Sequence, residues 1–339
     1  MKFWDREKEV AYLKRYLQSE PNAILFVYGP KSSGKSTLLA KVVDEIRKEK
    51  RAGFLRSWRV YWFDLRGALI SGYQSVIDLF FMEEESEASR EIERSFEAGI
   101  QGFFKVKRAV KEEFVQKRAD PFRYMEAVLK KVKKNMIVFD EIQRLKEVYI
   151  NGERSVVDAL FNFFVRITKV LHLSHVLVMT SDTFFIEEVY TSSALKNTSE
   201  FYLVDYFDDE TSLRILIDEG LSEEDARYVV ENVGGVPWMM ERILANGDVR
   251  EKVEELAMIY KSRLREILGR LYEVDESLQR ECKEFLKRFL REGVADLEGK
   301  DRKCVKVFVE NEVLFYDPVK GCVRFQTRLD ERAARELLV

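Results

Sequence analysis

The feature that most constrains this chain is a glycine-rich loop placed directly between an apolar run and a helix-like segment. The loop spans residues 29–37 and reads GPKSSGKST, which matches the pattern G-x-x-x-x-G-K-[ST]. Residues 23–28 before it form a continuous apolar run of strand length, typical of a strand buried on both faces of a parallel sheet. Residues 38–46 after it carry apolar side chains at helical spacing. This order predicts an α/β fold that binds a nucleotide.

The residue types in this loop suit phosphate binding. Backbone N–H groups of residues 32–35 can surround phosphate oxygens only where side chains are small and glycine permits the turn. We expect Lys35 to contact the β- and γ-phosphates of ATP and the Ser36 hydroxyl to bind Mg²⁺. The alternative is a glycine-rich turn that matches the pattern without a ligand. The predicted nucleotide-binding residues of the loop are Gly29, Pro30, Lys31, Ser32, Ser33, Gly34, Lys35, Ser36 and Thr37.

A second strand-like run, residues 136–140, ends in two carboxylates. After a loop of the kind described above, Asp140 is expected to hold the Mg²⁺ shell. Glu141 is then expected to orient or deprotonate the attacking water. The alternative is a buried strand that ends in solvated acids.

Three further runs, at residues 59–64, 176–181 and 201–204, have strand character and are separated by helical stretches. This alternation predicts a parallel sheet with helices on both faces. Where such a sheet has an additional strand between the loop strand and the acidic strand, the end of that strand lies beside the γ-phosphate. Thr180 or Ser181 would then sense the phosphate or position water; a polar strand end entering a loop is the competing interpretation.

The remaining patterns divide the chain into three parts. Residues 1–207 form the predicted P-loop core, with a mostly helical insertion at about 67–135 that contains an acidic and a basic run. Its first helix is expected at residues 5–19, with Asp5 as its cap. Residues 208–248 form a predicted helical lid. Residues 249–339 combine helices, short apolar pieces at 306–309 and 313–316, a turn at 317–321, a piece at 323–326 and a last helix at 330–338. The two β-prone pieces around the turn predict a hairpin, and helices followed by such a hairpin and a last helix predict a winged-helix-like domain.

Composition limits the classes of protein that remain. The chain has 57 Lys and Arg against 60 Asp and Glu, a net charge of −3, so no general affinity for polyanions is expected. The charge-rich composition, sparse in Asn, Gln and His, resembles that of hyperthermophile proteins. Three cysteines without a C-x-x-C pair argue against a zinc or disulfide framework, and His172 and His175 alone supply too few ligands for zinc. No run is long enough to span a membrane and no signal peptide is evident, so a cytoplasmic protein is expected.

Four places in the sequence together resemble the archaeal ATPase family of P-loop NTPases, which is related to the AAA-plus and STAND ATPases and to archaeal replication initiators. They are residues 3–9 (FWDREKE), the loop at 29–37, residues 139–143 (FDEIQ) and residues 234–237 (GGVP). The resemblance covers roughly the first 240 residues. It implies an ATP-binding core with a helical lid.

The resemblance also implies roles for the outer motifs. Phe3, Trp4 and Arg6 would lie near the adenine, although Arg6 could instead be a solvated residue of the first helical turn. Gly235 and Pro237 would pack at the nucleotide from the lid, with a plain helix break as the alternative. Arg242 is a sensor candidate for which a surface salt bridge is the competing interpretation.

One departure from the family concerns the arginine that relatives often place before the fifth strand. Residues 183–201 contain no arginine and offer only Lys196. An arginine finger contributes on the order of 10³ to 10⁵ in rate. Either hydrolysis is slow here or the arginine comes from elsewhere.

Two functions remain open at this stage. The first is an ATP-driven switch that hydrolyses ATP and transmits its nucleotide state to a protein partner through the C-terminal domain; the second is an ATP-regulated protein that binds duplex DNA. A phosphotransferase fits less well because Asp140 and Glu141 suit water activation. Oligomer formation stays open. The basic residues that bear on DNA binding are interleaved with acids; they are Arg263, Arg265, Arg270, Lys287, Arg288, Arg291, Lys300, Arg302, Lys303 and Lys306.

Overall fold

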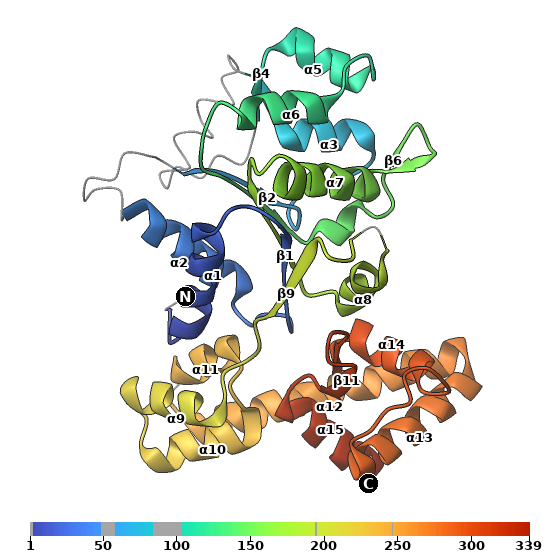
Figure 1. The fold of residues 1–339 in the computed structure, drawn as a ribbon. Helices are drawn as coiled ribbons and strands as arrows, with labels where there is room; N and C mark the ends of the chain where they lie inside the picture. Colours follow the sequence, from blue (N-terminus) through green and yellow to red (C-terminus); the bar gives the residue numbers. More distant parts are fainter. Residues whose placement is uncertain (1–2, 49–57, 84–103, 194, 246) are drawn as a thin grey trace. The chain divides into compact units, whose positions relative to one another are not determined.

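The computed structural model describes residues 3–48, 58–83, 104–193, 195–245 and 247–339 (Figure 1). The chain forms two compact units. The sheet unit comprises Arg6–Tyr28 and Lys35–Leu203. The helical unit comprises Met1–Asp5, Gly29–Gly34 and Val204–Val339.

The sheet unit is built on five parallel strands in the order β2-β5-β8-β1-β9. The strands are β1 (Ile24–Tyr28), β2 (Arg59–Asp64), β5 (Asn135–Asp140), β8 (His175–Thr180) and β9 (Ser199–Leu203). All five coincide with the predicted strands to within two residues, which confirms the α/β fold class. Strand β8 lies between β1 and β5, so the carboxyl ends of the loop strand and the acidic strand are separated by the end of β8.

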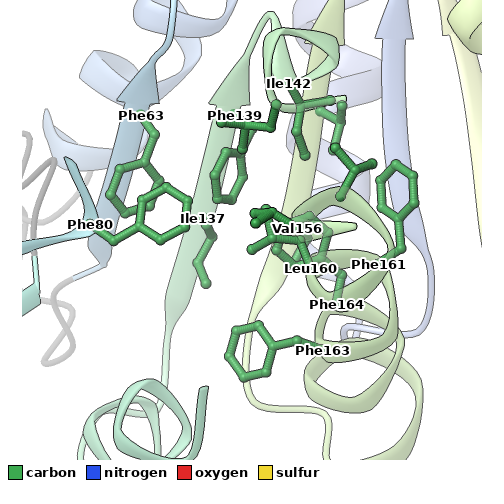
Figure 2. Packing of buried hydrophobic residues seen from close by; sticks show 14 of the residues in the cluster. Phe63, Phe80, Ile137, Phe139, Ile142, Val156, Leu160, Phe161, Phe163 and Phe164 are labelled. Carbon is green, nitrogen blue, oxygen red and sulfur yellow. The ribbon is translucent and has the colours of Figure 1, made fainter. Parts of the chain in front are cut away.

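The core of the sheet unit lies between the sheet and the helices on one of its faces. Alternate β5 residues, Ile137 and Phe139, point to this face, as the two-residue period of a strand requires. Phe139 packs against Phe164 of α7 (Val156–Val165), with ring centroids 5.1 Å apart (Figure 2). On the other face, Tyr16 of α1 (Glu7–Gln18) contacts His175 edge-on at 5.0 Å. The sheet is therefore covered on both faces, as expected for parallel strands.

Further helices and short strands complete this unit. They are α2 (Lys35–Lys48), α3 (Tyr73–Phe80), α5 (Arg108–Val115), α6 (Pro121–Leu129) and α8 (Thr183–Thr191), the short η2 (Ile142–Leu145) and η3 (Arg166–Val170), the parallel pair β3 (Phe81–Glu83) and β4 (Phe104–Val106), and the hairpin β6 (Tyr149–Ile150) with β7 (Arg154–Ser155). The predicted insertion thus contains a strand pair as well as helices. Most of its acidic run lies outside the described residues.

One local prediction was wrong. Asp5 does not cap the first helix: Arg6 takes the cap position without a side-chain cap hydrogen bond, and Asp5 pairs with Arg214. The apolar piece at 306–309, which the sequence left unassigned, lies within α14 (Arg302–Glu310). Val305 and Phe308 of that helix are both buried, and their three-residue spacing places them on one helical face.

The helical unit contains two hydrophobic clusters. Helices α9 (Asp209–Asp218), α10 (Glu223–Val233) and α11 (Pro237–Leu244) form the first cluster with the beginning of α12 (Val249–Val274). The rest of α12 joins the second cluster with the elements that follow. These are α13 (Glu276–Glu292), α14, β10 (Leu314–Asp317), β11 (Cys322–Phe325) and α15 (Arg328–Leu338). Helices followed by the antiparallel β10–β11 hairpin form the expected winged-helix-like module.

Across the described part of the chain, no helix combines the length and apolar character needed to cross a membrane.

Candidate nucleotide site

The glycine-rich loop joins the end of β1 to the first turn of α2, as predicted. Ser32 and Gly34 have φ values of 59° and 91°, so the backbone turns sharply just before the helix begins at Lys35. A Cβ atom built on Gly34 would meet no atom within 4 Å, which leaves open space beside this turn. A turn of this kind at a helix N-terminus presents backbone N–H groups to an anion, so the local geometry fits a phosphate group.

Lys35 is the buried cation of the site, with 7% of its surface exposed. Burial lowers its pKa to about 8, and the nearby carboxylates of Glu141 and Asp140 oppose that change by favouring the charged form. Because removal from water destabilises the ammonium group, an additional negative charge placed beside it would stabilise it. The phosphates of a bound nucleotide would supply that charge.

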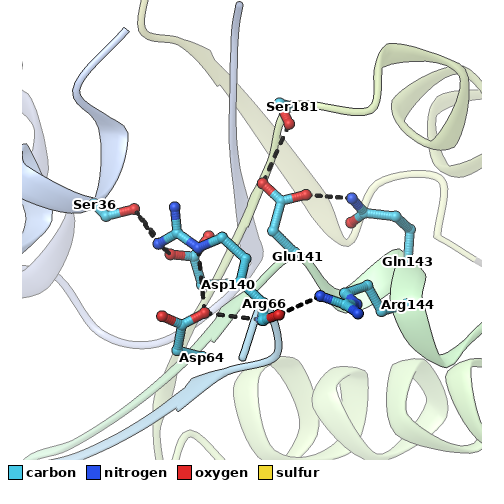
Figure 3. Close-up of polar contacts among 8 residues, drawn as sticks. All are labelled: Ser36, Asp64, Arg66, Asp140, Glu141, Gln143, Arg144 and Ser181. Carbon is cyan, nitrogen blue, oxygen red and sulfur yellow. Dashed lines mark hydrogen bonds and ion pairs between the residues drawn. The ribbon is translucent and has the colours of Figure 1, made fainter. Parts of the chain in front are cut away.

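Oxygen atoms from three elements converge at the end of β5. The Ser36 hydroxyl of α2 donates to Asp140 Oδ2 at 2.8 Å, and Asp64 at the end of β2 is paired in register with Asp140. Arg66 donates through its Nη2 atom to Ser36 Oγ at 2.9 Å and to Asp140 Oδ2, and through Nε to Asp64 Oδ1 at 3.2 Å (Figure 3). Hydroxyl and carboxylate oxygens are the ligands that Mg²⁺ prefers, and a guanidinium cation already lies among them. The donor set therefore fits the predicted metal.

Burial governs the charge of Asp140, whose surface is only 1% exposed. It raises the pKa of this carboxyl to about 6, while the hydrogen bond from Ser36 and the charge of Arg66 act in the opposite direction. A further cation beside Asp140 would therefore favour its ionised form.

Glu141 is held by a set of polar side chains. Its backbone is left-handed, with φ 64°, and its N–H donates to the Met179 carbonyl of β8 at 2.8 Å. Its carboxylate accepts hydrogen bonds from the Ser181 hydroxyl at 3.2 Å and from the Gln143 amide (Figure 3). Gln143 in turn accepts from the Thr180 hydroxyl at 2.9 Å. The structure therefore brings Ser181 to Glu141 directly and Thr180 to it only through Gln143.

A nucleotide site at this place agrees with the protein family that the sequence matches. A sequence profile for ATPase domains predominantly from Archaea matches residues 3–243. The chain belongs to this archaeal ATPase family.

Its relatives include uncharacterized ATP-binding proteins from two archaea. One from Methanocaldococcus jannaschii is 35% identical, and the match covers 96% of this chain and 91% of the relative. One from Pyrococcus abyssi is 30% identical, over 99% of this chain and 98% of the relative. Among solved structures, the Aeropyrum pernix ORC2 protein in its ADPNP–ADP complexes is similar at 12% identity and a TM-score of 0.48, with 99% of this chain and 95% of that chain covered. That likeness is too weak to transfer any property.

The structure describes the contacts of the two outer motifs, residues 3–9 and 234–237, and of Arg242. Arg6 is buried and donates to Glu9 at 2.8 Å, so it is not a solvated residue of the first turn. Pro237 is buried at the start of α11, and Gly235 lies directly against the Phe207 backbone. Arg242 forms a surface ion pair with Glu255 at 3.9 Å, as the competing interpretation expected. Nucleotide contacts by Arg6 and Pro237 stay predictions.

Three residues of the site were missed by the sequence analysis: Asp64, Arg66 and Gln143. Asp64 was recognised only as the end of a strand, and Gln143 only as part of a motif. Gln143 lies two residues after Glu141, so its signal is local, whereas the signal for Asp64 and Arg66 is topological. Once β2 is known to lie beside β5, the residues after β2 must lie beside Asp140, and the Leu65 N–H does bond the Asp140 carbonyl at 3.1 Å.

Proposed function

We propose that this archaeal ATPase hydrolyses ATP and acts as a switch, passing its nucleotide state to a protein partner through the C-terminal domain. The observation that carries the proposal is the Glu141 carboxylate, oriented by Ser181 and Gln143 next to Asp140. A carboxylate fixed in this way can accept a proton from water as the water attacks the γ-phosphorus.

In the proposed reaction, the P-loop backbone and Lys35 hold the β- and γ-phosphates. Ser36 and Asp140 would hold Mg²⁺, which when bound would neutralise charge on the phosphate oxygens. Glu141 takes one proton from water while the water oxygen bonds to the γ-phosphorus. The bond from that phosphorus to the β–γ bridging oxygen breaks, and ADP leaves with the electron pair. Thr180 acts indirectly, since its hydroxyl bonds Gln143 rather than Glu141.

Two variants test this assignment. Glu141→Gln is expected to lower kcat by about 10² to 10³, the usual contribution of a general base, while ATP binding persists. Lys35→Ala is expected to weaken ATP binding by about 100-fold or more, because the phosphates lose their buried cation. Phosphate release and binding of a fluorescent ATP analogue measure the two effects separately. Unchanged turnover in Glu141→Gln would refute the role given to this carboxylate.

Support for coupling comes from the helical unit, where the tip of the P-loop contacts the C-terminal domain. Lys31 pairs with Glu312 at 2.6 Å, and the Tyr206 hydroxyl donates to the Lys31 carbonyl at 2.9 Å. Lys31 is also one of the predicted nucleotide-binding residues. A phosphate that attracts its ammonium group would therefore compete with Glu312.

A protein partner is favoured over duplex DNA by the surroundings of the C-terminal basic residues. Many of these side chains are ion-paired with neighbouring acids, which lowers the positive charge available to DNA phosphates. The pairs are Arg263–Glu312, Arg270–Glu266, Lys287–Glu284, Arg288–Asp301 and Lys306–Glu310. Binding to a labelled duplex at low salt tests the alternative: affinity that depends on nucleotide and falls steeply with salt would favour DNA, and its absence would favour a protein partner.

A further inference from the structure

Arg66 occupies a central place in the site that the proposed hydrolysis does not explain. Its guanidinium bridges Ser36 Oγ, Asp140 Oδ2 and Asp64 Oδ1 (Figure 3). Its backbone N–H also donates to Asp64 Oδ1, at 3.0 Å. One side chain thus gathers two carboxylates and the P-loop serine around a single positive charge.

Two of the oxygens that bind this guanidinium, Ser36 Oγ and Asp140 Oδ2, belong to the residues expected to bind Mg²⁺. The metal needs oxygen ligands at about 2.0–2.1 Å in octahedral geometry. The Arg66 Nη2 atom uses lone pairs of the same Ser36 and Asp140 oxygens, at hydrogen-bonding distance. A nitrogen on both atoms takes the space and the lone pairs that the metal requires. Arg66 in this position and a metal at Ser36 and Asp140 therefore compete for the same two oxygens.

The Arg66 backbone is held by hydrogen bonds, whereas its side chain lies partly in solvent. The Arg66 carbonyl accepts a hydrogen bond from Arg144, and the preceding Leu65 N–H bonds the Asp140 carbonyl at 3.1 Å. The Arg66 side chain is nevertheless 51% exposed, so much of its path away from Asp140 is through solvent. An incoming metal would displace the guanidinium without moving the Arg66 backbone.

The displaced guanidinium would remain close to the phosphates. Phosphates bound at the P-loop beside Ser36 would lie near the position that Arg66 vacates. A long side chain tethered there could reach them by rotation about its own bonds. Residues 183–201 contain no arginine that could serve from the more usual position. Arg66 would then supply that charge from within the same chain.

We propose that Arg66 occupies the magnesium site until Mg²⁺ and ATP bind, and that its displaced guanidinium then neutralises charge on the γ-phosphate. The first half concerns binding alone, whereas the second half rests on the proposed ATP hydrolysis. Two experiments address these halves separately.

The first experiment measures the Mg²⁺ concentration that half-saturates binding of a fluorescent, non-hydrolysable ATP analogue. Arg66→Ala is expected to lower that concentration about tenfold, because the metal no longer competes with a resident cation. Arg59→Ala, at the other end of β2, is the matched control and is expected to bind like the wild type. An unchanged Mg²⁺ requirement in Arg66→Ala would overturn the proposed occupancy. Wild-type-like analogue affinity at saturating Mg²⁺ shows that the variant is folded.

The second experiment measures turnover. Arg66→Ala is expected to lower kcat on the order of 10³-fold at saturating Mg²⁺ and ATP, as loss of an arginine finger does. A mixture of Arg66→Ala with Glu141→Gln tests the origin of the arginine. If Arg66 acts within its own chain, no active site in the mixture has both groups and activity stays low; restored activity would show that it acts on a neighbour instead.

These outcomes separate the two proposals. A wild-type protein without turnover would refute ATP hydrolysis, and the Mg²⁺ titration would still decide whether Arg66 holds the metal site. Turnover that depends on Glu141 but not on Arg66 would leave the ATPase assignment intact and overturn the phosphate role of Arg66.

Discussion

At the end of β5, two adjacent carboxylates have different surroundings. Asp140 is buried beside Ser36 and Arg66. Glu141 instead has a left-handed backbone conformation and accepts hydrogen bonds from Ser181, just after β8, and from Gln143. The sequence predicted both acids and their separate roles from their place after an apolar strand. It could not predict Arg66 as a partner, because that contact depends on which strand lies beside β5.

Gly235 shows how closely backbone segments pack at a single residue. A Cβ atom at this position would lie 2.1 Å from the Phe207 carbonyl oxygen and 2.4 Å from Ser212 Oγ. Gly235→Ala is expected to lower the stability of the helical unit by about 1–3 kcal/mol or more, since the Phe207 backbone must move. The measurement is the midpoint of thermal unfolding.

A second glycine in the same unit provides the control. Gly269 lies inside α12, and a Cβ atom there would meet nothing within 4 Å. Gly269→Ala is expected to stabilise the protein by about 0.5–1 kcal/mol through its higher helix propensity. An equal loss of stability in both variants would contradict the close-packing argument.

Among the elements, β8 has the largest effect on the site, because its position between β1 and β5 brings Thr180 and Ser181 to the acidic strand. The sequence predicted this strand and its polar end, but left a plain strand-to-loop exit as an equal alternative. The hydrogen bonds of these two residues with Gln143 and Glu141 became visible only when the strand order was known. The piece at 306–309 lies within α14, and the sequence left it unassigned because four residues are too few to distinguish a strand from a helix.

Asp330, in the first turn of α15, is expected to make the stability of the protein depend on pH. Asp330 accepts hydrogen bonds from the Thr327 hydroxyl at 2.6 Å and from the Thr327 N–H at 3.0 Å, and it is only 4% exposed. Burial raises its pKa to about 7, against about 3.9 in an unfolded chain. Between these values the folded state retains a proton that the unfolded state releases. The contribution of Asp330 to stability therefore falls as the pH rises from about 4 to 7.

Asp330→Asn is expected to remove this part of the pH dependence. Relative to the wild type, the variant gains stability as the pH is raised from 4 to 8, because the amide carries no charge to bury. Unfolding midpoints at several pH values measure the difference. Glu331→Gln on the next position of α15, with a side chain 40% exposed, is the control. Parallel midpoint-versus-pH curves for the wild type and Asp330→Asn would exclude the assignment.

At the scale of the whole molecule, the proposed coupling between nucleotide binding and the C-terminal domain rests on the P-loop. Its tip belongs to the helical unit, and Lys31 pairs there with Glu312, between α14 and β10. Glu312 also lies 3.4 Å from Arg263 of α12. One carboxylate therefore joins the loop to the C-terminal domain through two ion pairs.

Glu312→Gln tests this connection. If ATP phosphates draw Lys31 away from Glu312, loss of the carboxylate is expected to increase ATP affinity about two- to fivefold, the range for an exposed ion pair of up to about 1 kcal/mol. Glu310→Gln is the matched control, since its carboxylate pairs with Lys306 within α14. Titration with a fluorescent ATP analogue measures both. Equal affinities in the two variants would argue against competition for Lys31.

The P-loop motif, the five strands and the two acids at the end of β5 could be read from the sequence alone, whereas the division into core, lid and C-terminal domain stays a prediction. These features depend on local spacing, on residue size and on apolar periodicity, all of which are written in short stretches of chain. Only the tertiary structure shows that Arg66 and Asp64 lie at the proposed metal site, that Thr180 meets Gln143 and that Glu312 meets Lys31. Each of these contacts joins elements that are far apart in the sequence, so it depends on strand order and helix packing rather than on a local pattern.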